Sequence, residues 1–402
     1  MTLLGHLPPQ RRSIVAMADL PDDPFGGLPF LGDLAKAMSG QGPISWDAAR
    51  QFAQLGATGG AAEANVDPGA RIAIDALAPI ARMHLEDVTG AAVPSQTPAV
   101  VTPGRWAQDT LEAYRPLFTD LATALSQQTD ADDAPTDPMA QMMAGLSKMM
   151  APAMLGMAVG SMIGDLARRA FGVHDLPIPR DTASLSIVAT TIDTFANEWD
   201  IPLDEMRMWV LAHEYAGAIV GAAPGLRSAL SALIRQHVAA FRPDPDAVAE
   251  RLSSLDMSGD DPMAALQRTL GDPEVLLGAI RSDEQRALEP SIDAIVSAVV
   301  GLTDWIVDAV AVRVVGGESL RIAEAVRRRR IETAPADAFV ERLLGVRLDA
   351  EQVRRGKEFV QGAVDRVGER HALDTLLTHP DAAPTAAELT APGLWLARLG
   401  IE

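Results

Sequence analysis

The sequence predicts a mainly α-helical protein with few or no β-strands. Alanine, the strongest helix former, is abundant, and aromatic residues make up only 4% of the chain. β-Branched residues rarely alternate with polar ones over the length of a strand. At 402 residues the chain is long enough for a large core, organised as two or three domains or as one large helical one.

The first 60 residues predict a Pro/Gly-rich arm that carries one short helix. Residues 20–30 contain three prolines, and Ser45 is a suitable N-cap for a helix over 46–55, with Asp47 in its first turn. This arm would bury little surface by itself. We expect it to precede a helical core over 61–316 and a C-terminal helical region over 317–402 that packs on the core.

Helical spacing and proline content divide the next part of the core. Helices are expected over 68–88, 105–126 and 139–171, separated by a proline-containing loop over 89–104 and an acidic linker over 129–138.

In the Met-rich helix, Gly156, Gly160 and Gly164 recur every four residues and share one face. A lipid-facing or dimerising helix would use such a face, and so would a tightly packed core helix in which Met fills gaps. We favour the core helix, because the apolar run from Met149 to Gly164 is shorter than the roughly 20 residues that a membrane span requires.

An extended loop over 172–180 and a short strand over 185–188 precede the central helix. His174 and Asp175 lie in this loop, where they either make a local turn contact or lie at a metal. The helix over 203–221 begins after Pro202 and is apolar nearly all round, which indicates a buried position. The pair His213 and Glu214 would then need partners in the interior.

The rest of the chain is also predicted to be helical. A second long apolar helix over 289–308 would pair with the central one, and it carries Asp304 and Asp308 one turn apart. The arginine run 327–330 is expected to form a solvated or salt-bridged face. The other expected segments are helices over 228–241, 243–255, 323–330, 339–345 and 350–370, short helices and turns over 256–273, and a capped segment over 379–389.

Composition excludes several classes of function. The formal charge of −20 repels nucleic acid and gives little attraction to anionic membranes. Without cysteine there is no disulfide, thiolate metal site or cysteine nucleophile. We see no secretory signal, phosphate-binding loop or Gly-x-Ser-x-Gly elbow, and we expect a cytoplasmic protein.

The stretch from Trp209 to Gly217 carries an incomplete catalytic motif. A helix that reads His-Glu-x-x-His places two zinc-binding imidazoles on one face and a Glu beside the metal-bound water as general base. His213 and Glu214 fit the first two positions, but position 217, where the second histidine belongs, is glycine.

Together with this stretch, four other segments resemble the zincin-like metallopeptidase family of actinobacteria and relatives, whose members are described as zinc-dependent metalloproteases or hydrolases. These segments are Pro24–Leu34, Gly42–Gln51, Gly164–Pro179 and Thr378–Leu389. The resemblance implies a multi-helix zincin-like fold, with His213 as a metal ligand and Glu214 as the catalytic base. It places Gly217 at the second ligand and Val300, before Gly301, at a glutamate ligand.

Two of the three implied ligands are therefore replaced, and we expect a degenerate zinc site with no cofactor. The expected role is non-catalytic binding of a peptide or protein in the former active-site cleft. The first alternative is an active zinc metallopeptidase that uses Glu214 as base and takes rearranged ligands from His174, His237, Asp304 or Asp308. The second alternative is a helical scaffold of unrelated function.

Overall fold

The computed structural model describes residues 42–129, 138–180, 184–241, 282–331, 340–341 and 343–401. The chain divides into two compact units, 1–41 and 42–402, and every described residue belongs to the second. The fold is mainly helical, as predicted. Three sets of expectations fall on residues that the structure does not describe. They are residues 1–41 of the predicted arm, most of the acidic linker predicted over 129–138, and the segments predicted over 243–255 and 256–273.

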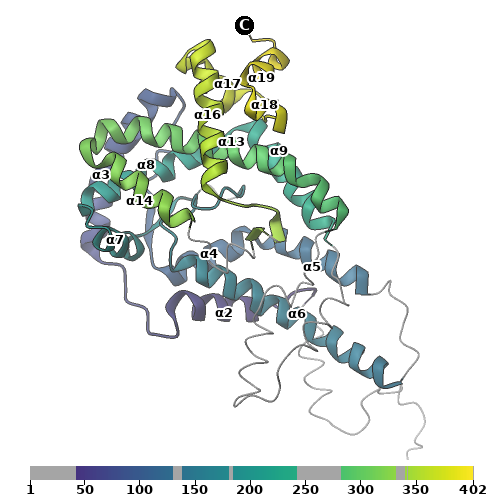
Figure 1. Ribbon diagram of the computed structural model, residues 1–402. Helices are drawn as coiled ribbons and strands as arrows, with labels where there is room; N and C mark the ends of the chain where they lie inside the picture. Colours follow the sequence, from purple (N-terminus) through teal and green to yellow (C-terminus); the bar gives the residue numbers. More distant parts are fainter. Residues whose placement is uncertain are drawn as a thin grey trace, which may run out of the picture. The chain divides into compact units, whose positions relative to one another are not determined.

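The described helices are labelled in chain order in Figure 1. They are α2 (Trp46–Thr58), α3 (Pro68–Thr89), α4 (Pro103–Ala113), α5 (Arg115–Thr129), α6 (Pro138–Ala167), α7 (Ala189–Glu198), α8 (Leu203–Ala222), α9 (Pro224–Ala239), α13 (Asp283–Val314), α14 (Ser319–Ile331), α16 (Ala350–Val367), α17 (Glu369–Thr378), α18 (Ala386–Thr390) and α19 (Pro392–Leu399), with the 3-10 turn η1 (Gly316–Glu318) before α14.

Two short strands pair in parallel within this helical fold. The strand β1 (Ala99–Val101) lies beside β2 (Ser186–Val188), with Val100 opposite Ile187. The prediction of a strand over 185–188 is confirmed, whereas β1 falls in a segment that was predicted to be a loop.

The helices α8 and α13 form the centre of the described fold. Most of α8 is buried, and it packs against α3 and α13, so the predicted pairing of the two apolar helices is confirmed. A capping box at Ser282 and Gln285 begins α13, which is longer than predicted. The apolar surfaces of α8 and α13 therefore cover each other.

The glycines of α6 form a close contact with α2, and these two helices run side by side (Figure 1). A Cβ atom at Gly160 would overlap the carbonyl oxygen of Ala49, and one at Gly164 would lie 2.7 Å from the carbonyl oxygen of Ala53. The Ser45 hydroxyl caps α2, as predicted, by accepting from the Ala48 N–H. The glycine face is thus used for packing within the fold.

By length and composition, two helices in the described part of the chain could cross a membrane, namely Met149–Ala167 of α6 and the whole of α13. The pair α8 and α9, bent by 80°, passes the same test together. In α13, 72% of the most apolar 18-residue stretch is buried inside the protein, and in α6 the corresponding share is 44%. Most of the apolar surface of α13 is therefore covered by neighbouring helices.

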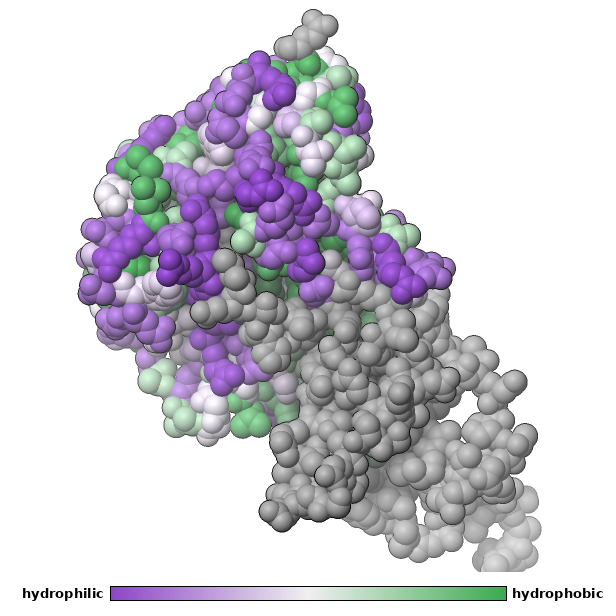
Figure 2. Space-filling view, viewed as in Figure 1, coloured by the Kyte–Doolittle hydropathy of each residue, from purple (hydrophilic) through white to green (hydrophobic). Residues whose placement is uncertain are grey.

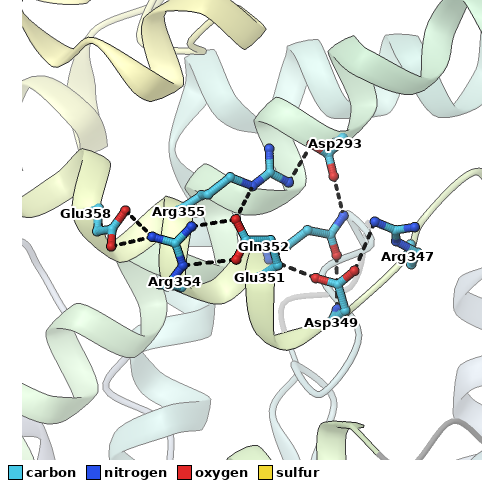
Figure 3. A network of polar contacts seen from close by, with 8 residues as sticks. All are labelled: Asp293, Arg347, Asp349, Glu351, Gln352, Arg354, Arg355 and Glu358. Atoms are coloured by element: carbon cyan, nitrogen blue, oxygen red, sulfur yellow. Dashed lines mark hydrogen bonds and ion pairs between the residues drawn. The ribbon is translucent and has the colours of Figure 1, made fainter.

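A backbone contact and a polar network join α16 to α13. Gly301 and Gly356 bring the two backbones together, since a Cβ atom on either glycine would overlap the other helix. Beside this crossing, Asp293 of α13 accepts from Gln352 at 2.6 Å and from Arg355 at 2.7 Å (Figure 3). The exposed pairs of Arg354 with Glu351 and Glu358 extend the network along α16.

Hydrophilic residues predominate in the middle of the coloured part of the face seen in Figure 2, and hydrophobic patches lie between them. Arg327 pairs with Asp308 at 3.2 Å, and Arg328 pairs with Glu324 at 3.1 Å. The guanidinium of Arg329 lies 3.8 Å from the ring centre of Phe171. Three arginines of the run, 327 to 329, therefore have acidic or aromatic partners in this chain, which agrees with the prediction of a salt-bridged face.

Candidate site around His213

His213 and Glu214 lie in the buried middle of α8. Their exposed fractions are 3% and 0%, and the His213 ring stacks on Trp209 with centroids 5.4 Å apart. A helix that is buried on nearly every side places such polar groups in the interior, where each requires partners.

The Glu214 carboxylate binds the loop that follows α6. Its Oε2 accepts from the backbone N–H of Val173 at 2.9 Å, and both oxygens lie 3.3 Å from the backbone nitrogen of His174. Nδ1 of His174 lies 3.1 Å from Oε2, and Nδ1 of His213 lies 3.5 Å from Oε1. The carboxylate is thus surrounded by donors from its own chain.

These contacts determine the charge of Glu214. Burial raises the pKa of its carboxyl, but hydrogen bonds from His174 and His213, with the charges of the two rings, outweigh burial and lower the pKa to about 2. Glu214 is therefore an ionised, fully buried carboxylate at neutral pH.

The loop that Glu214 binds is fixed from two further sides. Oδ2 of Asp175 accepts from the backbone N–H groups of Phe171 and Gly172. The indole N–H of Trp106 on α4 donates to the Gly172 carbonyl at 2.9 Å. These bonds place the side chains of His174 and Asp175 beside α8.

The His174 side chain occupies the space beside Gly217. A Cβ atom at position 217 would lie 2.5 Å from Cβ and 2.6 Å from Cγ of His174. Such separations are far shorter than normal carbon–carbon contacts, so only glycine allows this loop conformation. The position expected for a second histidine ligand is thus filled by a histidine from another segment.

A cavity of about 470 Å³ opens beside this pair. Its wall is formed by α8, α9, α13 and the loops over 94–96 and 174–180, and it includes His174, Asp175, Arg180, His213, Gly217, Val300 and Asp304. All three positions that the resemblance assigns to metal ligands, 213, 217 and 300, line this cavity. Glu214, with no exposed surface, does not line it.

Among the described residues, one group has the composition of a metal site. Asp175, His213 and Glu214 each offer a ligand atom, and these atoms lie within 4.8 Å of one another. Three protein ligands are the usual number in a catalytic zinc site. Both carboxylates of this group already accept backbone N–H bonds, as described above.

Only two of the four side chains considered as substitute ligands lie at this cavity. His174 and Asp304 line the cavity. His237 instead lies against Gln285, with its Nε2 3.3 Å from the amide nitrogen, and Asp308 pairs with Arg327 and Lys357.

The sequence predicts no role for Arg180, and it leaves open whether Asp175 makes a turn contact or lies at a metal. Both lie in a loop with two prolines and several polar residues, and this composition was the available signal. Their proximity to α8 depends on the tertiary contacts of Glu214 and Trp106.

Comparisons with known proteins agree with this architecture. The family model described as "Zincin-like metallopeptidase" matches residues 44–396. The crystal structure of a "putative hydrolase with a novel fold" from Chloroflexus aurantiacus superposes with a TM-score of 0.56 at 20% identity, over 89% of this chain and 99% of that one. At this identity it shows the fold alone. No curated protein sequence matches. Since the family model covers most of the chain, the protein belongs to the zincin-like metallopeptidase family.

Proposed function

We propose that this protein has lost the catalytic zinc centre of its family and binds a peptide or protein segment in the cavity beside α8 without cleaving it. The observation that carries the proposal is the orientation of Glu214. Its carboxylate accepts from the loop at Val173 and His174 and has no exposed surface. A general base must instead reach the water that it activates.

The donor chemistry supports the same conclusion about the metal. Bound zinc would act as a Lewis acid and lower the pKa of its water. The residues present do not fit such a centre, because Gly217 has no side chain and Val300 has only methyl groups. The two carboxylates near His213 are engaged by backbone amides.

The cavity is suited to binding. Its volume of about 470 Å³ lies within the roughly 300–1,000 Å³ typical of ligand sites. The net charge of −20 disfavours nucleic acid as the ligand and attraction to an anionic membrane surface. We propose a cytoplasmic location, consistent with the absence of cysteine.

A second candidate function is a metal-dependent hydrolase with rearranged ligands. The specific observation in its favour is the group of Asp175, His213 and Glu214, whose ligand atoms lie within 4.8 Å of one another. In this alternative a metal would take Asp175 in place of the missing histidine. Glu214 could then not be both a ligand and a free base.

Peptide capture with a cleavage readout tests the proposal. A tryptic digest of casein is incubated with the full chain, and mass spectrometry identifies retained and newly cleaved peptides. We expect retention without new cleavage. Ala218→Trp, which places an indole in the cavity wall, should abolish retention, whereas Ala76→Trp on the exposed side of α3 should not.

Circular dichroism confirms that both variants fold. New cleavage that disappears in His213→Ala would contradict the proposal and support the hydrolase. Equal retention by the Ala218 variant would exclude this cavity as the binding site.

A further inference from the structure

Arg180 is a cation in the cavity wall with only neutral partners. Its guanidinium donates to the Val173 carbonyl at 3.4 Å and to the Thr110 hydroxyl at 3.3 Å, both long bonds. It also lies 5.1 Å from the ring centre of Tyr114. Its Nε is buried and makes no hydrogen bond, and no carboxylate among the described residues pairs with it.

Two other partly buried arginines of the described residues have acidic partners. Arg207 pairs with Asp193 at 3.1 Å, and Arg355 pairs with Asp293 at 2.7 Å. Such pairing offsets the cost of removing a charge from water. Arg180 differs because its charge faces a cavity, so a ligand can supply the missing anion.

Tyr114 does not supply that anion. Burial raises the pKa of its phenol, so the hydroxyl remains neutral at physiological pH, and it donates to the Ile178 carbonyl at 3.3 Å. The phenol contributes an aromatic face to the guanidinium and is also a neutral hydrogen-bonding partner of it.

We propose that Arg180 binds the carboxylate of the cavity's ligand, which is a peptide with an apolar C-terminal segment and a free C-terminus. A guanidinium donates two parallel hydrogen bonds to a carboxylate, which a primary amide cannot accept in the same way. The apolar residues Leu226, Leu230 and Val299 of the wall would surround the rest of the segment. This inference rests on the proposed binding function.

The other charged groups of the cavity wall are consistent with a single ligand carboxylate bound at Arg180. Asp175 and Asp304 line the cavity and repel an anion that lies near them. Arg227 also lines it and donates to the Gly221 carbonyl at 3.3 Å, so it is a competing cation that the experiment must separate from Arg180.

Isothermal titration calorimetry with three probes tests the proposal. The probes are acetyl-Leu-Leu-Leu with a free C-terminus, the same peptide as its C-terminal amide, and decanoate. We expect the free acid to bind the full chain at least about tenfold more tightly than the amide, which corresponds to about 1.4 kcal/mol. Arg180→Gln should remove this preference, and Arg227→Gln, which removes the same charge from the same wall, should retain it.

Each outcome decides a separate point. Equal affinity for acid and amide overturns the assignment of Arg180 and leaves peptide binding standing. A preference that Arg227→Gln removes and Arg180→Gln retains also overturns it. Binding of decanoate alone contradicts a peptide ligand, and the absence of binding by all three probes overturns both proposals. If Arg180→Gln does not fold, Arg180→Lys, which keeps the charge and loses the planar pair of donors, should show a reduced preference.

Discussion

The side chain of His174 packs against α8 at Gly217, in the space that a larger side chain at this position would occupy. A Cβ atom on Gly217 would lie 2.5 Å from Cβ of His174. In the family pattern that the sequence resembles, position 217 would hold a zinc ligand. Here the loop after α6 occupies that space and is fixed by Glu214, the neighbour of His213.

Replacing Gly217 with alanine should destabilise the protein. Glycine to alanine inside a helix normally stabilises by about 1 kcal/mol, but at position 217 the new methyl group would displace His174. We expect a net loss of roughly 1–3 kcal/mol in the free energy of unfolding, measured with urea. Gly221→Ala is the matched control, because nothing lies within 4 Å of a Cβ atom there. A stabilised Gly217→Ala would contradict the packing described.

Glu214→Gln should cost stability in a pH-dependent way. The pKa of the Glu214 carboxyl is lowered from 4.5 to about 2, so its ionised form stabilises the fold by on the order of 3 kcal/mol. Because the folded-state pKa is the lower one, this contribution is complete above about pH 4.5 and is lost as the pH falls through about 2.

Urea unfolding of wild type and Glu214→Gln between pH 7 and pH 2 measures this dependence. The difference between the two should be largest at neutral pH and shrink in the acid range. Glu358→Gln, at an exposed position on α16, is the control and should show no comparable change. A difference that stays constant with pH would mean that charge is not the cause.

Gly160→Ala should loosen the contact between α6 and α2. Its Cβ atom would overlap the carbonyl of Ala49, and backbone cannot move aside as a flexible side chain can. We expect a loss of roughly 1–3 kcal/mol in the free energy of unfolding. Gly145→Ala on the same helix has open space around its Cβ and should be neutral or stabilising. Equal effects of the two substitutions would show that α6 and α2 do not pack closely at Gly160.

Restoring the ligands should restore zinc binding. Gly217→His with Val300→Glu supplies the two missing donors, and the structure adds His174→Ala to make room for the new ring. We expect the triple variant to bind zinc tightly by calorimetry, because positions 213, 217 and 300 line one cavity. Val300→Glu alone should not bind it. A folded triple variant without zinc binding would show that these positions do not correspond to the family's ligands.

Much of the fold could be predicted, because the two central helices carry long apolar runs. The strand β1 was missed, since three residues between prolines form a strand only by pairing with β2, more than eighty positions later. The predicted helix over 105–126 is two helices, α4 and α5, that meet at Tyr114. Pro116 was a visible signal for this break, because proline removes a helical hydrogen bond and restricts the preceding residue.

The candidate site was less predictable than the fold. The motif located His213 and Glu214, and the resemblance located Gly217 and Val300. No local pattern indicates that the carboxylate of Glu214 binds the backbone of Val173, forty-one positions earlier. That contact is a product of tertiary folding, and it anchors the loop after α6 to α8.

Zinc content tests the central claim most directly. The full chain and His213→Ala are expressed with added zinc, purified without chelator and measured by elemental analysis. If the centre has been lost, both proteins should contain the same background amount of zinc. One zinc ion per chain in the wild type, absent from His213→Ala, would contradict the account.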